Sequence, residues 1–175
     1  GQHNPGGGTG TPPSSTTGTA HAPTTNTMPA GQQAAAANAA FAQAVRTCQV
    51  SPAAPCDLSS FVIAGSPEAR AIAQKLQSLA AKGLHARLNA QSRFTVEKVA
   101  VGNPPTQAVV TSCEVNADVL YTPGAGPNGQ DVIYNNQVDA YRSDAVMRLD
   151  GGGWKLYTVT NYQQWVGSAC PPPAS

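Results

Sequence analysis

The chain has 175 residues, a formal net charge of +1, and charged side chains at only 11% of its positions. This near-neutral balance excludes the strong positive field that recruits nucleic acid or an acidic membrane surface. The length fits one domain with an extension, and no apolar run is long enough to cross a membrane.

The extension is at the N-terminus, where no Asp, Glu, Lys or Arg occurs before Arg46. Residues 1–30 consist mostly of Gly, Pro, Ser, Thr and Asn, so they cannot bury enough apolar surface to offset the entropy of ordering. We predict a disordered linker here. A linker ahead of a domain favours a surface tether, and we expect a removed signal peptide with either a lipid-modified cysteine or a transmembrane anchor preceding residue 1.

Two helices are predicted next. Alanine dominates residues 31–47, where Phe41 and Val45 form a narrow apolar stripe. A proline-rich stretch ends this helix, and the apolar segment 58–63 predicts a single helical turn. The second helix begins at Ser66-Pro67-Glu68, which combines an N-cap, a first-position proline and an acidic first turn, and it ends at Gly83.

After Gly83 the apolar period changes from 3.6 to 2, which predicts strands. We expect strands at 84–88, 94–101, 108–121 and 154–162, with one long or two shorter strands between 131 and 150. In the strand 108–121 the odd-numbered residues from Val109 to Tyr121 share one face. Helices followed by antiparallel strands predict an α+β fold, in which N-terminal helices pack on a bent antiparallel sheet.

The four cysteines, Cys48, Cys56, Cys113 and Cys170, allow three pairings. We favour Cys48 with Cys56 around the proline-rich loop, and Cys113 with Cys170. Two disulfides predict an extracytoplasmic protein. No C-x-x-C and no neighbouring histidine pair occurs, so we expect neither a metal nor a cofactor.

The order of the elements, together with an apolar strand that leads into Asp150-Gly-Gly-Gly-Trp-Lys-Leu156, resembles the nuclear transport factor 2-like (cystatin-like) family. Among its members, the chain is similar to secreted or lipid-anchored actinobacterial proteins of unassigned function. The resemblance covers residues 31–166 and implies a domain over 31–170, with a Pro-rich tail at 171–175. The family's sheet forms a cone. In ketosteroid isomerase, polyketide cyclases and scytalone dehydratase its mouth houses an enzyme site, whereas many other members have none, so the fold implies no activity.

The enzymes of that family place an acid or base inside the cone and a Tyr or second acid nearby. The residues here that could serve are His85, Asp118, Asp139, Tyr141, Asp144, Tyr157 and Tyr162. We expect His85 to face solvent, and Arg142 with Asp144 to form a surface ion pair, a shared polar pocket being the alternative. Tyr157, Tyr162 and Trp165 are predicted to form an aromatic cluster of core and rim. No catalytic residue is assigned.

The glycine-rich loop from Pro123 to Gln130 lacks the Lys-Ser/Thr of a phosphate loop. We predict an exposed hairpin loop and, with the residues that follow it, a protein contact surface; a polar strand edge is the alternative. The residues of this surface are Pro123, Asn128, Gln130, Tyr134, Asn135 and Asn136.

The predicted function is that of a non-enzymatic, exported cell-envelope protein that binds a protein partner or assembles within a complex. The alternative is a small-ligand pocket with lyase or isomerase chemistry. A cone filled by apolar side chains favours the first function, and an open cavity with an inward Asp or His and a nearby Tyr favours the second.

Overall fold

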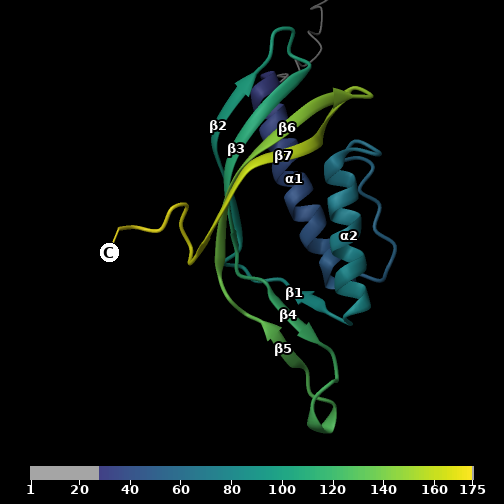
Figure 1. Cartoon of the computed structure of the whole chain (residues 1–175). Coiled ribbons are helices and arrows are strands. Elements are labelled where there is room, and N and C mark those ends of the chain that lie inside the picture. Colours follow the sequence, from purple (N-terminus) through teal and green to yellow (C-terminus); the bar gives the residue numbers. More distant parts are fainter. Residues whose placement is uncertain (1–27, 175) are drawn as a thin grey trace, which may run out of the picture.

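The computed structural model describes residues 28–174 (Figure 1). Residues 1–27 of the predicted linker lie outside this range. Within it, no helix combines the length and the apolar character that a membrane crossing requires.

Helix α1, Ala30–Val50, presents one buried stripe with a spacing of three or four residues. The stripe consists of Ala34, Asn38, Phe41, Val45 and Gln49. The helix extends slightly beyond its predicted end, so that Cys48 lies in its last turn and the disulfide to Cys56 closes the loop that follows. Polar side chains therefore occupy two positions of a stripe that faces inward.

Helix α2, Pro67–Ala81, begins as predicted, because the Ser66 hydroxyl accepts a hydrogen bond of 3.1 Å from the Ala69 N–H. Gly83, just beyond the helix, has a φ of +64°, which favours glycine. Residues 58–63 form a hydrogen-bonded turn rather than a helix, and Val62 forms a bridge with Leu156. The turn therefore contacts the C-terminal strand, residues 153–166, through backbone pairing at Leu156.

Two antiparallel sheets follow the helices. Sheet A has the order β2 (Arg93–Val101), β3 (Gln107–Asn116), β6 (Asp139–Asp150) and β7 (Gly153–Val166). Sheet B has the order β1 (His85–Arg87), β4 (Val119–Thr122) and β5 (Val132–Asn135). Both helices lie against the concave face of sheet A (Figure 1), which confirms the α+β prediction.

The prediction of a single strand over 108–121 is wrong. The chain turns after Asn116, whose side-chain oxygen accepts the Asp118 N–H at 2.9 Å, and β4 continues in the other sheet. Between 131 and 150 the two-strand alternative is correct, since β5 and β6 belong to different sheets. Strand β7 runs past its predicted end to Val166.

The core lies between α1, the turn at Val62 and sheet A, and Trp154 packs in it as the largest side chain. On β3 the residues that face the helices are the even-numbered ones, Ala108, Val110 and Ser112. The apolar odd-numbered residues that the sequence pattern emphasises lie on the outer face.

The disulfide between Cys113 and Cys170 ties the C-terminal segment to this outer face, and the Arg142 guanidinium donates to the Cys170 carbonyl. Both predicted pairings are confirmed, and the described residues contain no free cysteine. Two closed disulfides are consistent with an extracytoplasmic location.

Candidate functional site

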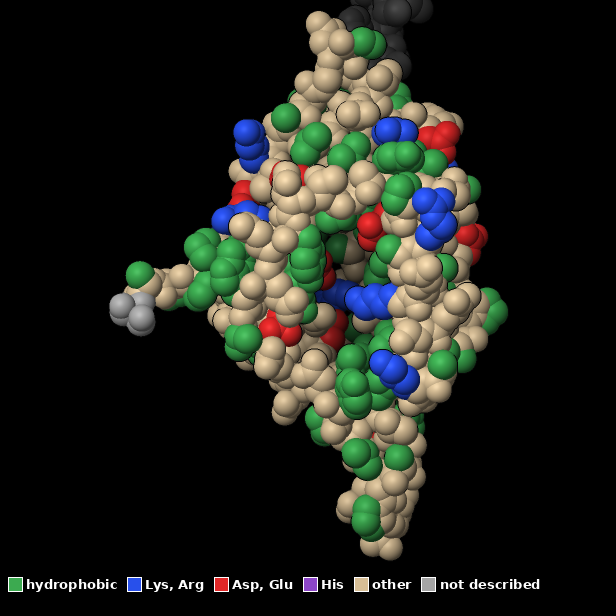
Figure 2. Space-filling view, viewed as in Figure 1, with side chains coloured by type: hydrophobic (Ala, Val, Ile, Leu, Met, Phe, Trp, Pro, Cys, Tyr) green, Lys and Arg blue, Asp and Glu red, His purple; other side chains and the backbone are tan. Residues whose placement is uncertain are grey.

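A cavity of about 420 Å³ lies between α1, α2 and the concave face of sheet A. Figure 2 shows the hollow in the middle of this face, with a basic side chain reaching across it and acidic side chains around it. One part of its wall is apolar and includes Phe41, Ile72, Leu156 and Val159. The rest is polar, so the cavity is amphipathic.

Glu114 projects into the polar part from β3. Burial raises the pKa of its carboxyl, and the positive charges of Lys75 and Arg46 offset this only in part. Among the described residues, no group is found to donate a hydrogen bond to Glu114. The carboxyl therefore retains its full capacity to accept hydrogen bonds, and it takes up a proton more readily than an exposed glutamate does.

Two stacked phenols stand beside this carboxyl. Tyr141 and Tyr162 have ring centroids 5.5 Å apart, and both line the cavity. The Tyr141 hydroxyl donates to Asp139 at 3.4 Å, and Asp139 also accepts from the Gln137 amide at 2.7 Å. Burial and the nearby carboxylates raise the pKa of Tyr141. Tyr162 is 60% exposed, and the pKa of its hydroxyl is raised in the same direction, so both phenols keep their protons near neutral pH and act as hydrogen-bond donors.

Small polar side chains line a buried part of the cavity. Asn38 on α1 is 4% exposed and Ser112 on β3 is 3% exposed, and Ser143 lies beside them on β6. In residues 28–174 no buried side-chain polar atom is sealed away without a hydrogen-bond partner. The polar atoms of Asn38 and Ser112 therefore open on the cavity, where water or a ligand satisfies them.

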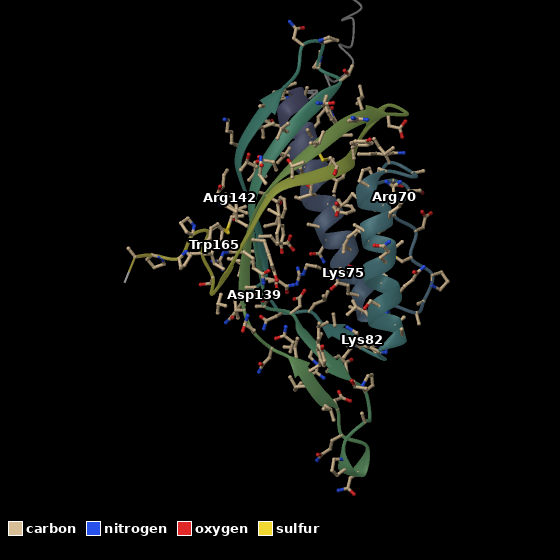
Figure 3. All side chains as sticks on the ribbon, viewed as in Figure 1. Arg70, Lys75, Lys82, Asp139, Arg142 and Trp165 are labelled. Carbon is tan, nitrogen blue, oxygen red and sulfur yellow. A yellow bond between two sulfur atoms is a disulfide. The ribbon has the colours of Figure 1, made fainter. Side chains whose placement is uncertain are left out.

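Helix α2 contributes the charged rim. Figure 3 shows Lys75 on the side of α2 that faces the sheet, opposite Asp139 on β6. Glu68 also lines the cavity, and burial raises the pKa of its carboxyl more than Lys75 lowers it. Because Arg46 is paired with Asp118, two carboxylates and one ammonium remain to meet an occupant.

Asp118, one of the predicted acids, has a structural role at the junction of the two sheets. It accepts hydrogen bonds from two nitrogens of Arg46 at 2.7 Å and from the Asn89 N–H and the Ser92 hydroxyl at 2.8 Å. Burial raises the pKa of Asp118, but these hydrogen bonds outweigh it and hold the pKa below its usual range. All four of these hydrogen bonds come from within the protein, three to Oδ1 and one to Oδ2.

His85 lies outside the cavity, on β1. It is half-buried, and its Nδ1 is 2.8 Å from the Val50 carbonyl at the end of α1. The side chain is only partly exposed, so the prediction that His85 faces solvent is confirmed in part. Its contact with the helix end indicates a structural role.

Arg142 and Asp144 lie on the outer face of sheet A, and the predicted ion pair between them is wrong. Arg142 instead pairs with Glu97 at 2.8 Å. Asp144 accepts from the Thr111 hydroxyl at 2.5 Å and from the Asn161 amide at 2.6 Å. These neighbours come from adjacent strands, whose proximity the local sequence does not reveal.

The predicted aromatic cluster is divided between the two faces of the sheet. Tyr162 lines the cavity, whereas Tyr157 and Trp165 lie under arginines. The Arg148 guanidinium is 3.5 Å from the Tyr157 ring centroid, and that of Arg142 is 5.9 Å from Trp165. The outer pairs are surface contacts and not a ligand platform.

The predicted contact residues gather on one projecting hairpin, which we call the arm and define as residues 119–135 with Asn136 after it. All six are exposed and lie away from the cavity: Pro123, Asn128, Gln130, Tyr134, Asn135 and Asn136. The loop between β4 and β5 is a hairpin loop, as predicted. Its role in protein contact stays a prediction.

Glu114, Lys75 and Asn38 line the cavity but are not among the residues predicted from the sequence. The available signal was a polar residue on each inward face: Asn38 interrupts the apolar stripe of α1, and Glu114 follows Ser112 on the even-numbered face of β3. Within the described range, no group of three or more His, Cys, Asp or Glu side chains is placed to hold a metal ion.

No protein-family model matches the chain, and no curated protein matches it. Among solved structures, the crystal structure of the intermembrane space region of chloroplast protein ARC6 is similar, with a TM-score of 0.48 and 15% sequence identity. The similarity covers 78% of this chain and 97% of that chain. At this score and identity it assigns neither a family nor a function.

Proposed function

We propose that the cavity binds a small amphipathic molecule whose polar group donates hydrogen bonds to Glu114. The observation that carries the proposal is a carboxyl with no hydrogen-bond donor among the described residues, inside a cavity of about 420 Å³. Its oxygens open on the cavity rather than being sealed off, since no buried side-chain polar atom of residues 28–174 lacks a partner, so a donor inside the cavity can reach them. An open cavity with an inward acid and nearby tyrosines supports the alternative function in the sequence analysis over a filled cone.

The charges around the cavity favour an amine or a hydroxyl as the donor. Glu68 and Glu114 outnumber Lys75, which leaves a negative excess once Arg46 is assigned to Asp118. An ammonium or alcohol group would satisfy Glu114, while Phe41 and Ile72 would cover an apolar body. A carboxylate ligand would meet like charge at the centre of the site.

The same groups suit proton transfer, which the lyase or isomerase hypothesis requires. A carboxyl whose pKa is raised towards neutrality is a better base for this purpose than an exposed one, and a protonated phenol stabilises developing negative charge. Ligand binding is the step that binding and catalysis share.

We further propose that the domain is an exported member of the nuclear transport factor 2-like family, tethered by the linker at 1–30. Helices on the concave face of a bent antiparallel sheet support the family proposal, and the two disulfides support export.

The ligand proposal is tested with matched probes: phenethylamine, phenethyl alcohol and 3-phenylpropionate. Amide chemical shifts of the isotope-labelled protein report where each probe binds. We expect the amine to bind most tightly, then the alcohol, with shifts at Ser112, Glu114 and Tyr141. If the carboxylate binds most tightly, or if no probe shifts the cavity residues, the proposal is wrong.

Two pairs of variants sharpen this test. Glu114→Gln is expected to weaken amine binding, and Glu97→Gln on the outer face is its control. Ser143→Phe is expected to fill the cavity and abolish binding of the amine and the alcohol alike, and Thr95→Phe, which adds the same ring at an exposed outer position, is its control.

A second candidate function is contact with another protein of the cell envelope through the arm. The specific observation is a run of three exposed large side chains, Val132, Ile133 and Tyr134. They lie on consecutive residues of an edge strand, and exposed apolar side chains beside an unpaired edge favour pairing with another strand.

A further inference from the structure

Strand β5 is an open edge of sheet B. It pairs with β4 alone, so its second row of backbone N–H and C=O groups faces away from the sheet. Val132, Ile133 and Tyr134 on this strand are 44%, 47% and 63% exposed. An edge of this kind is a template for another β-strand.

The edge strand has no charged side chain and no proline, although it is only four residues long and its pairing with β4 includes a register shift. Proteins blunt free edges with charged side chains or prolines, but β5 reads Val-Ile-Tyr-Asn. Asp131 is the only charged residue between Val119 and Val138, and its carboxylate is held by Arg87 at 2.9 Å and by the Gly124 N–H at 3.1 Å. Any strand that docks here therefore meets a neutral, apolar edge.

The position of the arm leaves this edge accessible. In Figure 1 the arm projects beyond the helices and away from sheet A. In Figure 2 its surface is mostly uncharged and partly apolar on the face shown. A strand can approach β5 without displacing another element, because β5 has no other partner among the described strands.

We propose that β5 pairs in antiparallel fashion with β5 of a second copy of this chain. The two three-stranded sheets B then join into one sheet across a two-fold axis. The proposal rests on the second candidate function, contact through the arm, and it is independent of the cavity. The occupant of the edge is therefore β5 of a second copy of this chain.

The pattern of side chains supports a second copy as the occupant. A two-fold axis through the pair places Ile133 opposite Ile133 of the other copy, and Val132 opposite Tyr134. Val132 and Tyr134 point to one face of the strand and Ile133 to the other, so each exposed apolar side chain gains an apolar neighbour. The neutral edge brings no like charges together.

The pairing involves only four residues from each copy, so we expect a weak and reversible dimer. A surface-tethered protein gains from such a contact, since tethering raises the local concentration of copies. The register makes the proposal specific enough to test by cross-linking.

The first test introduces single cysteines into the full chain and follows disulfide dimers under a glutathione redox buffer. Ile133→Cys is expected to form dimers at least about tenfold faster than Val132→Cys, because only position 133 meets its own copy within disulfide reach. A mixture of Val132→Cys and Tyr134→Cys is expected to form the mixed dimer. Equal rates for Ile133→Cys and Val132→Cys would overturn the register.

The second test is sedimentation of the full chain over a range of concentrations. The parent protein is expected to dimerise, and Ile133→Lys, which places two ammonium groups opposite one another, is expected to abolish dimers. Val166→Lys is the matched control, since Val166 is 68% exposed at the end of the edge strand β7. Dimers that survive Ile133→Lys would contradict the proposal.

A dissociation constant weaker than about 1 mM for the parent would also overturn it. If that monomer nevertheless binds a synthetic Val-Ile-Tyr-Val strand at β5, the arm contacts other proteins and the second copy is the wrong occupant. Ile133→Lys should bind phenethylamine like the parent protein. Retained amine binding would show that a failure here leaves the proposed ligand site intact.

Discussion

Asp118 and Glu114 lie four residues apart on one stretch of chain, yet their surroundings are opposite. Asp118 accepts four hydrogen bonds from Arg46, Asn89 and Ser92, and the pKa of its carboxyl is lowered. Glu114 has no such donors among the described residues, and burial raises its pKa. A carboxylate that accepts four hydrogen bonds from the protein stabilises the fold. A carboxylate that accepts none from the described residues and lines a cavity is available to a ligand.

The largest expected effect on the free energy of unfolding is at Asp118. Asp118→Ala leaves the Arg46 guanidinium unpaired where its side chain is only 17% exposed, and breaking a buried pair costs about 3–5 kcal/mol of unfolding free energy. Urea denaturation measures the loss. Asp131→Ala is the control, because its pair with Arg87 is exposed and contributes under about 1 kcal/mol. A similar small loss at Asp118 would remove the contrast.

Lowering the pH should remove the contribution of Asp118 to stability. The lowered pKa of Asp118 means that the folded state binds this proton less tightly than the unfolded chain does. Its contribution is therefore present above the ordinary aspartate pKa of about 3.9, and it is lost as the pH falls through the lower folded value. In Asp118→Asn this acid-dependent part of the loss of stability should be absent.

The next largest loss of stability is expected at Cys113, on the outer face of β3. Cys113→Ser opens the disulfide to Cys170 and is expected to lower the unfolding free energy by about 2–4 kcal/mol. Since Cys113 points away from the cavity, phenethylamine binding below the melting temperature should stay unchanged. Loss of binding in a folded variant would show that the two faces of β3 are coupled.

The smallest expected effect is a gain of stability, and it comes from replacing Glu114. A raised pKa means that the folded state binds the Glu114 proton more tightly than the unfolded chain does, so stability falls as the pH rises from about 4.3 through the folded value. Glu114→Gln escapes this loss. The variant is expected to melt at a higher temperature than the parent near neutral pH, and the difference should vanish as the pH approaches about 4. A lower melting temperature at neutral pH would mean that Glu114 is stabilised within the fold.

Local signals explain what could be predicted from the sequence. Ser66, Pro67 and Gly83 determine the ends of α2 through contacts within a few residues, so the helix was predictable. The bend between β3 and β4 was not, because apolar alternation runs unbroken through Val119 even though a turn at Asn116 interrupts the strand and Arg46, 72 residues from Asp118, holds the Asp118 carboxylate there. Alternation therefore reports a strand but not its interruption.

For the same reason, the cavity could not be predicted from the sequence. Alternation shows that Ser112 and Glu114 share a face, but it does not show which face meets the helices. The odd-numbered face of β3 is more apolar, yet it lies outside beneath the C-terminal segment that the Cys113–Cys170 disulfide holds. Only the packing of α1 and α2 decides that Glu114 points inward.

The most direct test of the contrast is a pH titration of the side-chain carboxyl carbons by NMR, with and without phenethylamine. Without the probe, we predict that Glu114 titrates above the ordinary glutamate pKa of about 4.3 and that Asp118 titrates below about 3.9. The bound amine should lower the pKa of Glu114, because it donates to the charged form, and leave that of Asp118 unchanged. A Glu114 that titrates at or below its ordinary value, or that does not respond to the amine, would contradict the account.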